Sequence, residues 1–221
     1  MHTENQEFVP NPKFYIKDIQ EQIEGQRVLD IGCCATHEKN NLKRHIKYEE
    51  TAGEIIGLDI NKEYIKKGLE KHPNLELLYC DVTDKKQVEK LIPTIGRFDH
   101  VIATDIIEHV GNLTNLLDNI RLFMTPQGNL YLTAPNCRSI FRHAMWTKRI
   151  PYLANHDHIC WFDIETLTTL LARSGFYVHQ EMYCALRNDI NLAERFGIPF
   201  HIGLSNKIYL IVRKEEASGL C

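Results

Sequence analysis

Short apolar segments alternate with longer amphipathic segments along the chain as far as Ala134. The apolar segments have the length and composition of buried strands, and they predict strands at 27–31, 54–59, 75–79, 98–104 and 128–134. The amphipathic segments repeat apolar residues at helical spacing, and they predict helices at 12–24, 38–50, 62–71, 84–92 and 112–124. This alternation is typical of a mostly parallel sheet with helices on both faces.

Beyond Ala134 the alternation becomes irregular and then resumes near the end of the chain. Asp163 is placed to cap a helix that stops at Ser174-Gly175. The segments 176–182 and 207–213 then predict two final strands. We therefore expect an α/β fold, a doubly wound and mostly parallel seven-stranded sheet with helices on both faces.

The length and composition favour one domain over residues 1–221. A chain of 221 residues with 43% hydrophobic content can build one good core. Two segments, 135–160 and 186–204, interrupt the regular pattern, and we expect both to be insertions that form lids over a substrate. The second could instead be a long connection.

Charge and cysteine usage narrow the range of partners and compartments. The formal net charge of -3 gives no general electrostatic case for nucleic acid or an acidic membrane surface. No apolar run approaches the ~20 residues of a membrane span, and the polar N-terminus is unlike a signal peptide. Seven cysteines without a CxxC pair indicate reduced thiols. We expect a cytoplasmic protein that engages no membrane.

The clearest local motif is the strand that ends in Asp30 and continues into the glycine turn Gly32-Cys33-Cys34. Glycine at such a break lets the backbone approach a ligand closely. A second acid, Asp59, ends the next predicted strand, at a spacing that suits a βαβ unit whose second carboxylate binds a ribose. These features predict a cofactor that contains a nucleoside.

Five motif-like segments follow one another along the chain: Val28–Cys33, Leu58–Ile60, Cys80–Val82, Phe98–Val110 and Leu132–Asn136. In this order they resemble the first motif, the ribose acid, the adenine site, the fourth strand and the fifth strand of the class I S-adenosylmethionine-dependent methyltransferases, in particular the ubiquinone-type small-molecule branch. The resemblance implies the Rossmann-like methyltransferase fold and S-adenosylmethionine as methyl donor. It implies cofactor contacts at Asp30, Gly32, Cys34, Asp59, Ile60, Asp81, Val82 and Thr104.

Each implied contact has a physical role. Asp59 could accept both ribose hydroxyls, and Asp81 could accept from the adenine amine. Asp30 could order the glycine turn or reach the methionine ammonium. Cys34 stands where the family usually has a second glycine, so its side chain would narrow the space beside the methionine. Each acid, taken alone, could instead cap a helix.

A second group of candidate residues follows the fourth strand. Asp105, Glu108 and His109 would share one face if a helix began near Asp105, and His158 lies downstream. Two carboxylates and two imidazoles could bind a divalent cation. The pattern is similar to that of the small-RNA 3′-terminal 2′-O-methyltransferases, with Asp105 in place of their first glutamate. Alternatively the group orients the cofactor, and His109 and His158 act without a metal, with His109 as general base.

Basic and aromatic residues mix in the segment 137–152. They are Arg138, Phe141, Arg142, Trp146, Lys148, Arg149 and Tyr152. Such a segment could hold a phosphate-bearing acceptor or stack on RNA bases. It could also be an amphipathic lid helix whose charges are solvated.

Together these features favour an S-adenosylmethionine-dependent O-methyltransferase that acts on a hydroxyl of a small metabolite or a sugar, including nucleotide sugars. A metal-dependent RNA 2′-O-methyltransferase is the first alternative, although the near-neutral charge argues against a nucleic-acid partner. The second is an inactive cofactor-binding partner subunit, for which Cys34 is the sequence support. The sequence does not predict the oligomeric state.

Overall fold

The computed structural model of the protein describes residues 7–9, 14–34, 42–140, 142–143, 157–184 and 207–215. Its centre is one mixed sheet in the order β1-β7-β8-β6-β5-β2-β3-β4. The strands are β1 (Glu7–Val9), β2 (Arg27–Ile31), β3 (Glu54–Asp59), β4 (Glu76–Tyr79), β5 (Phe98–Thr104), β6 (Met124–Pro135), β7 (Phe176–Cys184) and β8 (Lys207–Lys214).

The seven predicted strands are all present and give the strand order typical of this Rossmann-like fold. β8 runs antiparallel to both of its neighbours, β6 and β7, and the other strand pairs are parallel. The eighth strand, β1, pairs with the end of β7 at the edge of the sheet. Its three residues are too few to produce a periodic signal, which explains why the sequence pattern misses it.

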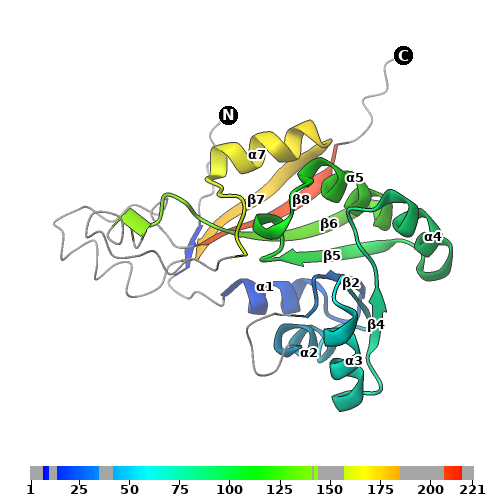
Figure 1. The fold of residues 1–221 in the computed structure, drawn as a ribbon. Coiled ribbons are helices and arrows are strands. Elements are labelled where there is room, and N and C mark those ends of the chain that lie inside the picture. The colour runs from blue at the N-terminus through cyan, green and yellow to red at the C-terminus, as the bar shows by residue number, and fades with distance from the viewer. Residues whose placement is uncertain are drawn as a thin grey trace.

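Helices cover both faces of the sheet, as Figure 1 shows. One face packs against α4 (Lys85–Ile95), α5 (Leu113–Phe123) and α7 (Ile164–Arg173). The other face packs against α1 (Phe14–Gln22), α2 (Lys43–Glu49) and α3 (Lys62–Lys71). The doubly wound architecture is therefore confirmed.

Local chemistry explains where several of these elements begin and end. Asp163 caps α7 in a capping box with Thr166, and Gly175 follows the helix with φ 70°, as the sequence predicts. Asn61 caps α3, whose observed bounds match the predicted range. Among the described residues, no helix is long and apolar enough to span a membrane.

Gly57 in β3 offers a direct test of how tightly the first βαβ unit packs. An added Cβ would lie 2.7 Å from Leu77 Cδ2, 2.8 Å from Cys33 Sγ and 2.9 Å from the His45 ring. We expect Gly57→Ala to lower the free energy of unfolding by about 1–3 kcal/mol, since overpacking forces neighbours to shift. Urea denaturation measures this change.

Gly111 provides the matched control, because its added Cβ would meet Ile159 only at an ordinary 3.7 Å. Gly111→Ala should change the free energy of unfolding by no more than about 0.5 kcal/mol. Equal stability of Gly57→Ala and the wild type would show that the packing between β3 and the glycine turn is looser than described.

Candidate active site

The carboxyl ends of the parallel strands meet at one edge of the sheet, and the predicted site residues lie there. β2 ends at Ile31, β3 at Asp59, β4 at Tyr79 and β5 at Thr104. Ligands of open α/β sheets bind outside this edge. The fold thus brings segments that are far apart in sequence to a common place.

The glycine turn after β2 is stabilised by backbone contacts. Gly32 has φ 72°, a conformation that side-chain-bearing residues rarely adopt, and its N–H donates to the Leu58 carbonyl at 2.8 Å. A Cβ on Gly32 would overlap the side chain of Ile106. Glycine is therefore required here both for the backbone angle and for the packing of the loop after β5.

Cys34, at the second glycine position of the motif, points into the core. Its side chain is buried with Leu42, Ile65 and Leu77, and its Sγ lies 3.8 Å from Cys33 Sγ. The predicted narrowing of the methionine space by this side chain is therefore not what the packing indicates. The six described cysteines are free thiols. The hydrogen bond between Cys33 and Cys34, followed by burial, raises the pKa of Cys33 well above its usual value.

Asp59 connects the glycine turn to the end of β3. Its Oδ2 accepts from the Cys34 N–H at 2.9 Å, and its Oδ1 accepts from the Asn61 N–H at 2.8 Å. Burial raises the pKa of Asp59, against the effect of the backbone donors Asn61, Cys34 and Ile60. A carboxylate has about four acceptor sites, so Asp59 keeps acceptor capacity for a ribose hydroxyl.

Ile60 follows Asp59 and is 62% exposed, which is unusual for a large apolar side chain at the end of a buried strand. An apolar surface beside a diol-binding carboxylate suits the flat adenine of a nucleoside. Asp59 and Ile60 together therefore fit the cofactor that the motifs imply.

Asp30 is held by a residue that sequence reasoning missed. Its Oδ2 lies 2.8 Å from Nδ1 of His45, and both side chains are buried. With an ionised carboxylate as acceptor, His45 must donate from Nδ1. This contact ties α2 to the end of β2, and the predicted role of Asp30 in ordering the glycine turn or reaching the methionine ammonium stays a prediction.

Asp81 and Val82 form the loop after β4. Asp81 Oδ1 accepts from the backbone and hydroxyl of Thr83 at 2.9 and 2.7 Å, and Asp84 caps α4. The Val82 carbonyl accepts from the Asn119 amide at 2.8 Å. The side chains of Val82 and Thr104 are buried, so any contact of these two residues with a cofactor would come from the backbone.

Asp105 has a different environment from the predicted one. It adopts φ 56°, and its carboxylate pairs with Lys207 Nζ at 2.6 Å and Arg44 Nη1 at 2.8 Å. Thr133 Oγ1 donates to it at 2.9 Å. Burial alone would raise the pKa of Asp105, but the Lys207 and Arg44 cations outweigh it and hold that pKa well below its usual range.

The predicted helical face at 105, 108 and 109 does not form. The chain makes a short 3-10 helix at Ile107–His109, and the left-handed backbone of Asp105 turns its carboxylate toward the two cations. The metal set predicted from the sequence is therefore incomplete. Glu108, His109 and His158 do come together, with one ligand atom from each within 4.8 Å of the others.

Glu108 is a buried carboxyl group that forms no salt bridge with a lysine or arginine of the described residues. It is 1% exposed, its Oε2 has no hydrogen-bond partner among the described residues, and its Oε1 lies 4.0 Å from His158 Nε2. Burial and the nearby Asp105 carboxylate raise the pKa of Glu108 to about 8. Glu108 is therefore largely neutral at pH 7.

His109 and His158 pack edge to face, with ring centroids 4.7 Å apart. His109 Nδ1 lies 3.1 Å from the Asp157 carbonyl, which can only accept, so Nδ1 donates and Nε2 is left as the acceptor. Burial and the neighbouring His109 and Arg142 lower the pKa of His158. The Arg142 guanidinium stacks 3.8 Å above the Trp161 ring, which contacts His158.

A family model described as a methyltransferase domain matches residues 7–181, which include the whole glycine turn, Asp59, Asp81 and the Glu108–His109 pair. The chain belongs to the class I S-adenosylmethionine-dependent methyltransferases. Among curated proteins, the mitochondrial ubiquinone biosynthesis O-methyltransferase of Dictyostelium discoideum is 25% identical over 135 residues, 57% of this chain and 40% of that protein.

The Bos taurus protein of the same name is 26% identical over 121 residues, 52% of this chain and 30% of that protein. This methyltransferase thus matches less than half the length of either relative.

Solved structures agree on the fold. A methyltransferase from Mesorhizobium loti has a TM-score of 0.62 at 14% identity, over 92% of this chain and 98% of that one. A methyltransferase from Archaeoglobus fulgidus has a TM-score of 0.59 at 20% sequence identity, over 93% of this chain and 95% of that one.

Several features of the methyltransferase site carry no signal in the sequence. Arg44, His45 and Lys207 are ordinary members of amphipathic or strand segments, and only the fold brings them to Asp30 and Asp105. Other predicted residues lie outside the described part of the chain, namely Phe141, Trp146, Lys148, Arg149, Tyr152 and the segment 186–204.

Replacement of Asp59 tests the cofactor site. We expect Asp59→Ala to weaken S-adenosylmethionine binding by about 1.5–3 kcal/mol, because a charge-assisted contact to the ribose is lost. Calorimetric titration measures the change, and circular dichroism checks the fold. Asp84→Ala is the control, since it removes a capping carboxylate from α4 and should leave cofactor affinity unchanged. Equal affinity of Asp59→Ala and the wild type would contradict the ribose assignment.

The buried Glu108 predicts a specific pH dependence of stability. Its pKa is raised from the ordinary 4.5 to about 8, so the folded protein holds this proton more tightly than the unfolded chain does. Between these pH values the stability contributed by Glu108 should therefore fall as the pH rises, by up to about 1.4 kcal/mol per unit. Urea denaturation at several pH values should show this slope in the wild type and a flatter one in Glu108→Gln. The same pH dependence of stability in the wild type and in Glu108→Gln would rule out a raised pKa of Glu108.

Proposed function

We propose that this methyltransferase transfers the methyl group of S-adenosylmethionine to a hydroxyl of a small metabolite or a sugar, with His109 as general base. The observation that carries the proposal is the fixed tautomer of His109, whose Nδ1 is bound to the Asp157 carbonyl and whose Nε2 can take a proton. The two distant relatives named as O-methyltransferases support the choice of a hydroxyl acceptor.

Different residues at the carboxyl edge would bind different parts of S-adenosylmethionine. Asp59 would take the ribose hydroxyls, Ile60 would cover one adenine face, and the Gly32 turn would lie beside the methionine part. S-adenosylmethionine supplies a methyl group already activated by the positive sulfur. The protein then mainly has to align the acceptor oxygen with that methyl carbon.

Proton removal from the acceptor completes the reaction. As the acceptor oxygen bonds to the methyl carbon, its O–H bond breaks and the proton passes to His109 Nε2, while the carbon–sulfur bond breaks and its electrons stay on sulfur. Neutral Glu108 would have a carboxyl O–H with which to donate a hydrogen bond to the acceptor oxygen.

A phosphate-bearing acceptor, such as a nucleotide sugar, is supported by Arg142. Its guanidinium is held over Trp161 beside His158, on the same side as the proposed base. Arg138, the other described arginine of this segment, is paired with Asp163 and Glu165 at 2.7 and 3.0 Å. The position of Arg142 over Trp161, beside His158, makes it a candidate for contact with a phosphate.

The cluster of Glu108, His109 and His158 also supports a second candidate, a metal-dependent RNA 2′-O-methyltransferase. Two imidazoles and one carboxylate suit Mn²⁺, Co²⁺ or Fe²⁺ better than Mg²⁺. A cation held there would lower the pKa of the acceptor hydroxyl. The raised pKa of Glu108 and the pairing of Asp105 with two cations count against this candidate, since both reduce the negative charge offered to a metal.

One experiment separates the two candidates. Methyl transfer from radiolabelled S-adenosylmethionine would be measured on catechols, hexoses, nucleotide sugars and short RNAs, with protein shown to be metal-free after EDTA treatment. We expect activity on a small acceptor to survive EDTA. His109→Ala should lower kcat by about 10²–10⁴-fold, because it removes the base.

His179→Ala is the matched control, since this exposed histidine of β7 lies away from the site and should leave kcat unchanged. Activity that disappears with EDTA and returns with Mn²⁺ or Co²⁺ would contradict the metal-free base and support the metal-dependent candidate. Unaltered kcat in His109→Ala would exclude His109 as the base.

A further inference from the structure

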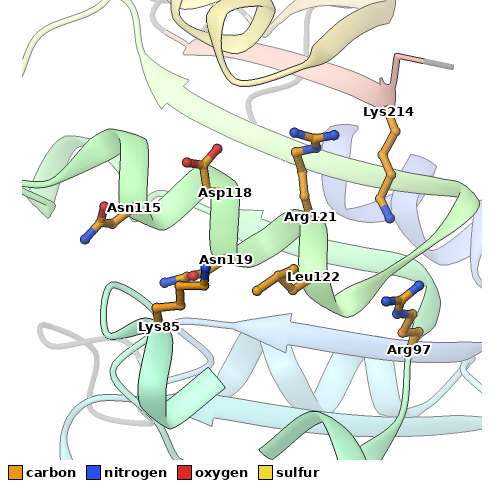
Figure 2. A pocket seen from close by; sticks show the side chains of 8 residues that line it. All are labelled: Lys85, Arg97, Asn115, Asp118, Asn119, Arg121, Leu122 and Lys214. Atoms are coloured by element: carbon orange, nitrogen blue, oxygen red, sulfur yellow. The ribbon is translucent and has the colours of Figure 1, made fainter. Parts of the chain in front are cut away.

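A pocket runs along α5, from the loop after β4 to the edge of the sheet opposite the methyl-transfer site. It has a volume of about 560 Å³, and its walls come from the start of α4, the length of α5, the turn before β5 and the end of β8. Figure 2 shows the side chains that line it. Arg97 precedes β5 and Lys214 ends the antiparallel β8, so both mark the edge opposite the methyl-transfer site.

The pocket carries an excess of positive charge. Lys85, Arg97, Arg121 and Lys214 line it, and Asp118 is the one acidic side chain in its wall. Lys85 is paired with Glu89 at 3.7 Å. Arg97, Arg121 and Lys214 form no ion pair with any carboxylate of the described residues.

These three cations affect one another. Burial and the charges of Arg97 and Arg121 lower the pKa of Lys214 to about 8, so the pocket favours loss of positive charge unless an anion is present. Arg121 Nε is buried and has no hydrogen-bond partner among the described residues. A buried donor of this kind is rare in folded proteins and calls for a partner.

The guanidinium of Arg121 packs against the start of β7. A Cβ on Gly175 would lie 2.8 Å from Arg121 Nη1, so the absence of a side chain at this glycine makes room for the guanidinium. The guanidinium also lies 5.9 Å from the centre of the Phe176 ring. Lys214 Nζ donates to the Met124 carbonyl at 2.7 Å, which leaves its other two donors for a ligand.

The size of the pocket selects among anions. Its lining on α5 runs from Asn115 to Leu122, about 10 Å along the helix at 1.5 Å per residue. That length exceeds a single phosphate and accommodates two linked ones. The side-chain amides of Asn115 and Asn119 donate to the carbonyls of Thr83 and Val82, so the far end of the pocket adjoins the loop after β4.

We propose that this pocket is a binding site for a small soluble anion with two or more linked phosphate groups, held by Arg97, Arg121 and Lys214. Arg97 and Lys214 lie at the edge of the sheet opposite Asp59 and the glycine turn, which would hold S-adenosylmethionine. The paired oxygens of a diphosphate match the forked donors of the two guanidinium groups, and the ammonium supplies a third positive charge.

Calorimetric titration with pyrophosphate tests this proposal, with orthophosphate as the comparison ligand. The wild type should bind pyrophosphate saturably and at least tenfold more tightly than orthophosphate, both with and without S-adenosylhomocysteine. The double variant Arg97→Gln/Lys214→Gln should bind pyrophosphate at least tenfold more weakly. Arg97→Gln alone changes an exposed side chain, so its expected several-fold loss remains measurable even if the double variant does not fold.

Lys66→Gln is the charge-matched control, since Lys66 is exposed on α3, which covers the opposite face of the sheet. It should change the pyrophosphate dissociation constant less than twofold. Absence of saturable binding in the wild type would overturn the proposal. So would an equal loss in Lys66→Gln, or complete displacement of pyrophosphate by S-adenosylhomocysteine, which would locate the anion in the cofactor site.

Discussion

The arrangement of the candidate active site depends on the carboxylate of Asp105. It sits at the end of β5 in a left-handed conformation and binds Arg44 from α2, Lys207 from β8 and Thr133 from β6. Four elements that are distant in sequence are thus joined through one charged group. Because the two cations are partly buried with Asp105, removal of the carboxylate would leave both without this partner, which costs more than the loss of an exposed ion pair.

The same charge sets the chemistry of the neighbouring residue. Asp105 lies close enough to Glu108 to oppose its ionisation, and burial acts in the same direction. Two carboxyl groups of one loop therefore differ in charge at neutral pH, one strongly acidic and one largely protonated. Divergence of this kind is how proteins assign acid and base roles to similar side chains.

Most of the fold could be predicted from the sequence, because strands such as 27–31 and 54–59 are buried beyond their first residue and helices such as 62–71 carry one apolar face. β1 could not, since three edge residues pair only where β7 happens to end. The helix expected at Asp105 also failed. Its polar spacing suited a helix, but the attraction of Lys207 and Arg44 is a long-range effect that no local pattern contains.

The site was predictable to a similar degree. The acids at strand ends could be located because parallel strands bring their carboxyl ends together, and Glu108, His109 and His158 do converge. The partners that determine what these groups do were not predictable. His45 on Asp30 and the carbonyl of Asp157 on His109 depend on tertiary packing across long separations in sequence. The sequence motifs therefore located the candidate side chains, and the contacts made in the fold determine which of their atoms carry protons.

The central claim is that Asp105 and burial together keep Glu108 neutral beside His109. Carbon-13 NMR titration of the side-chain carboxyl groups tests it directly, with the Glu108 signal assigned by its disappearance in Glu108→Gln. The account predicts a titration midpoint near pH 8 for Glu108. A midpoint near 4.5, the ordinary value for a glutamate, would contradict it and would mean that Glu108 is ionised when the methyl group is transferred.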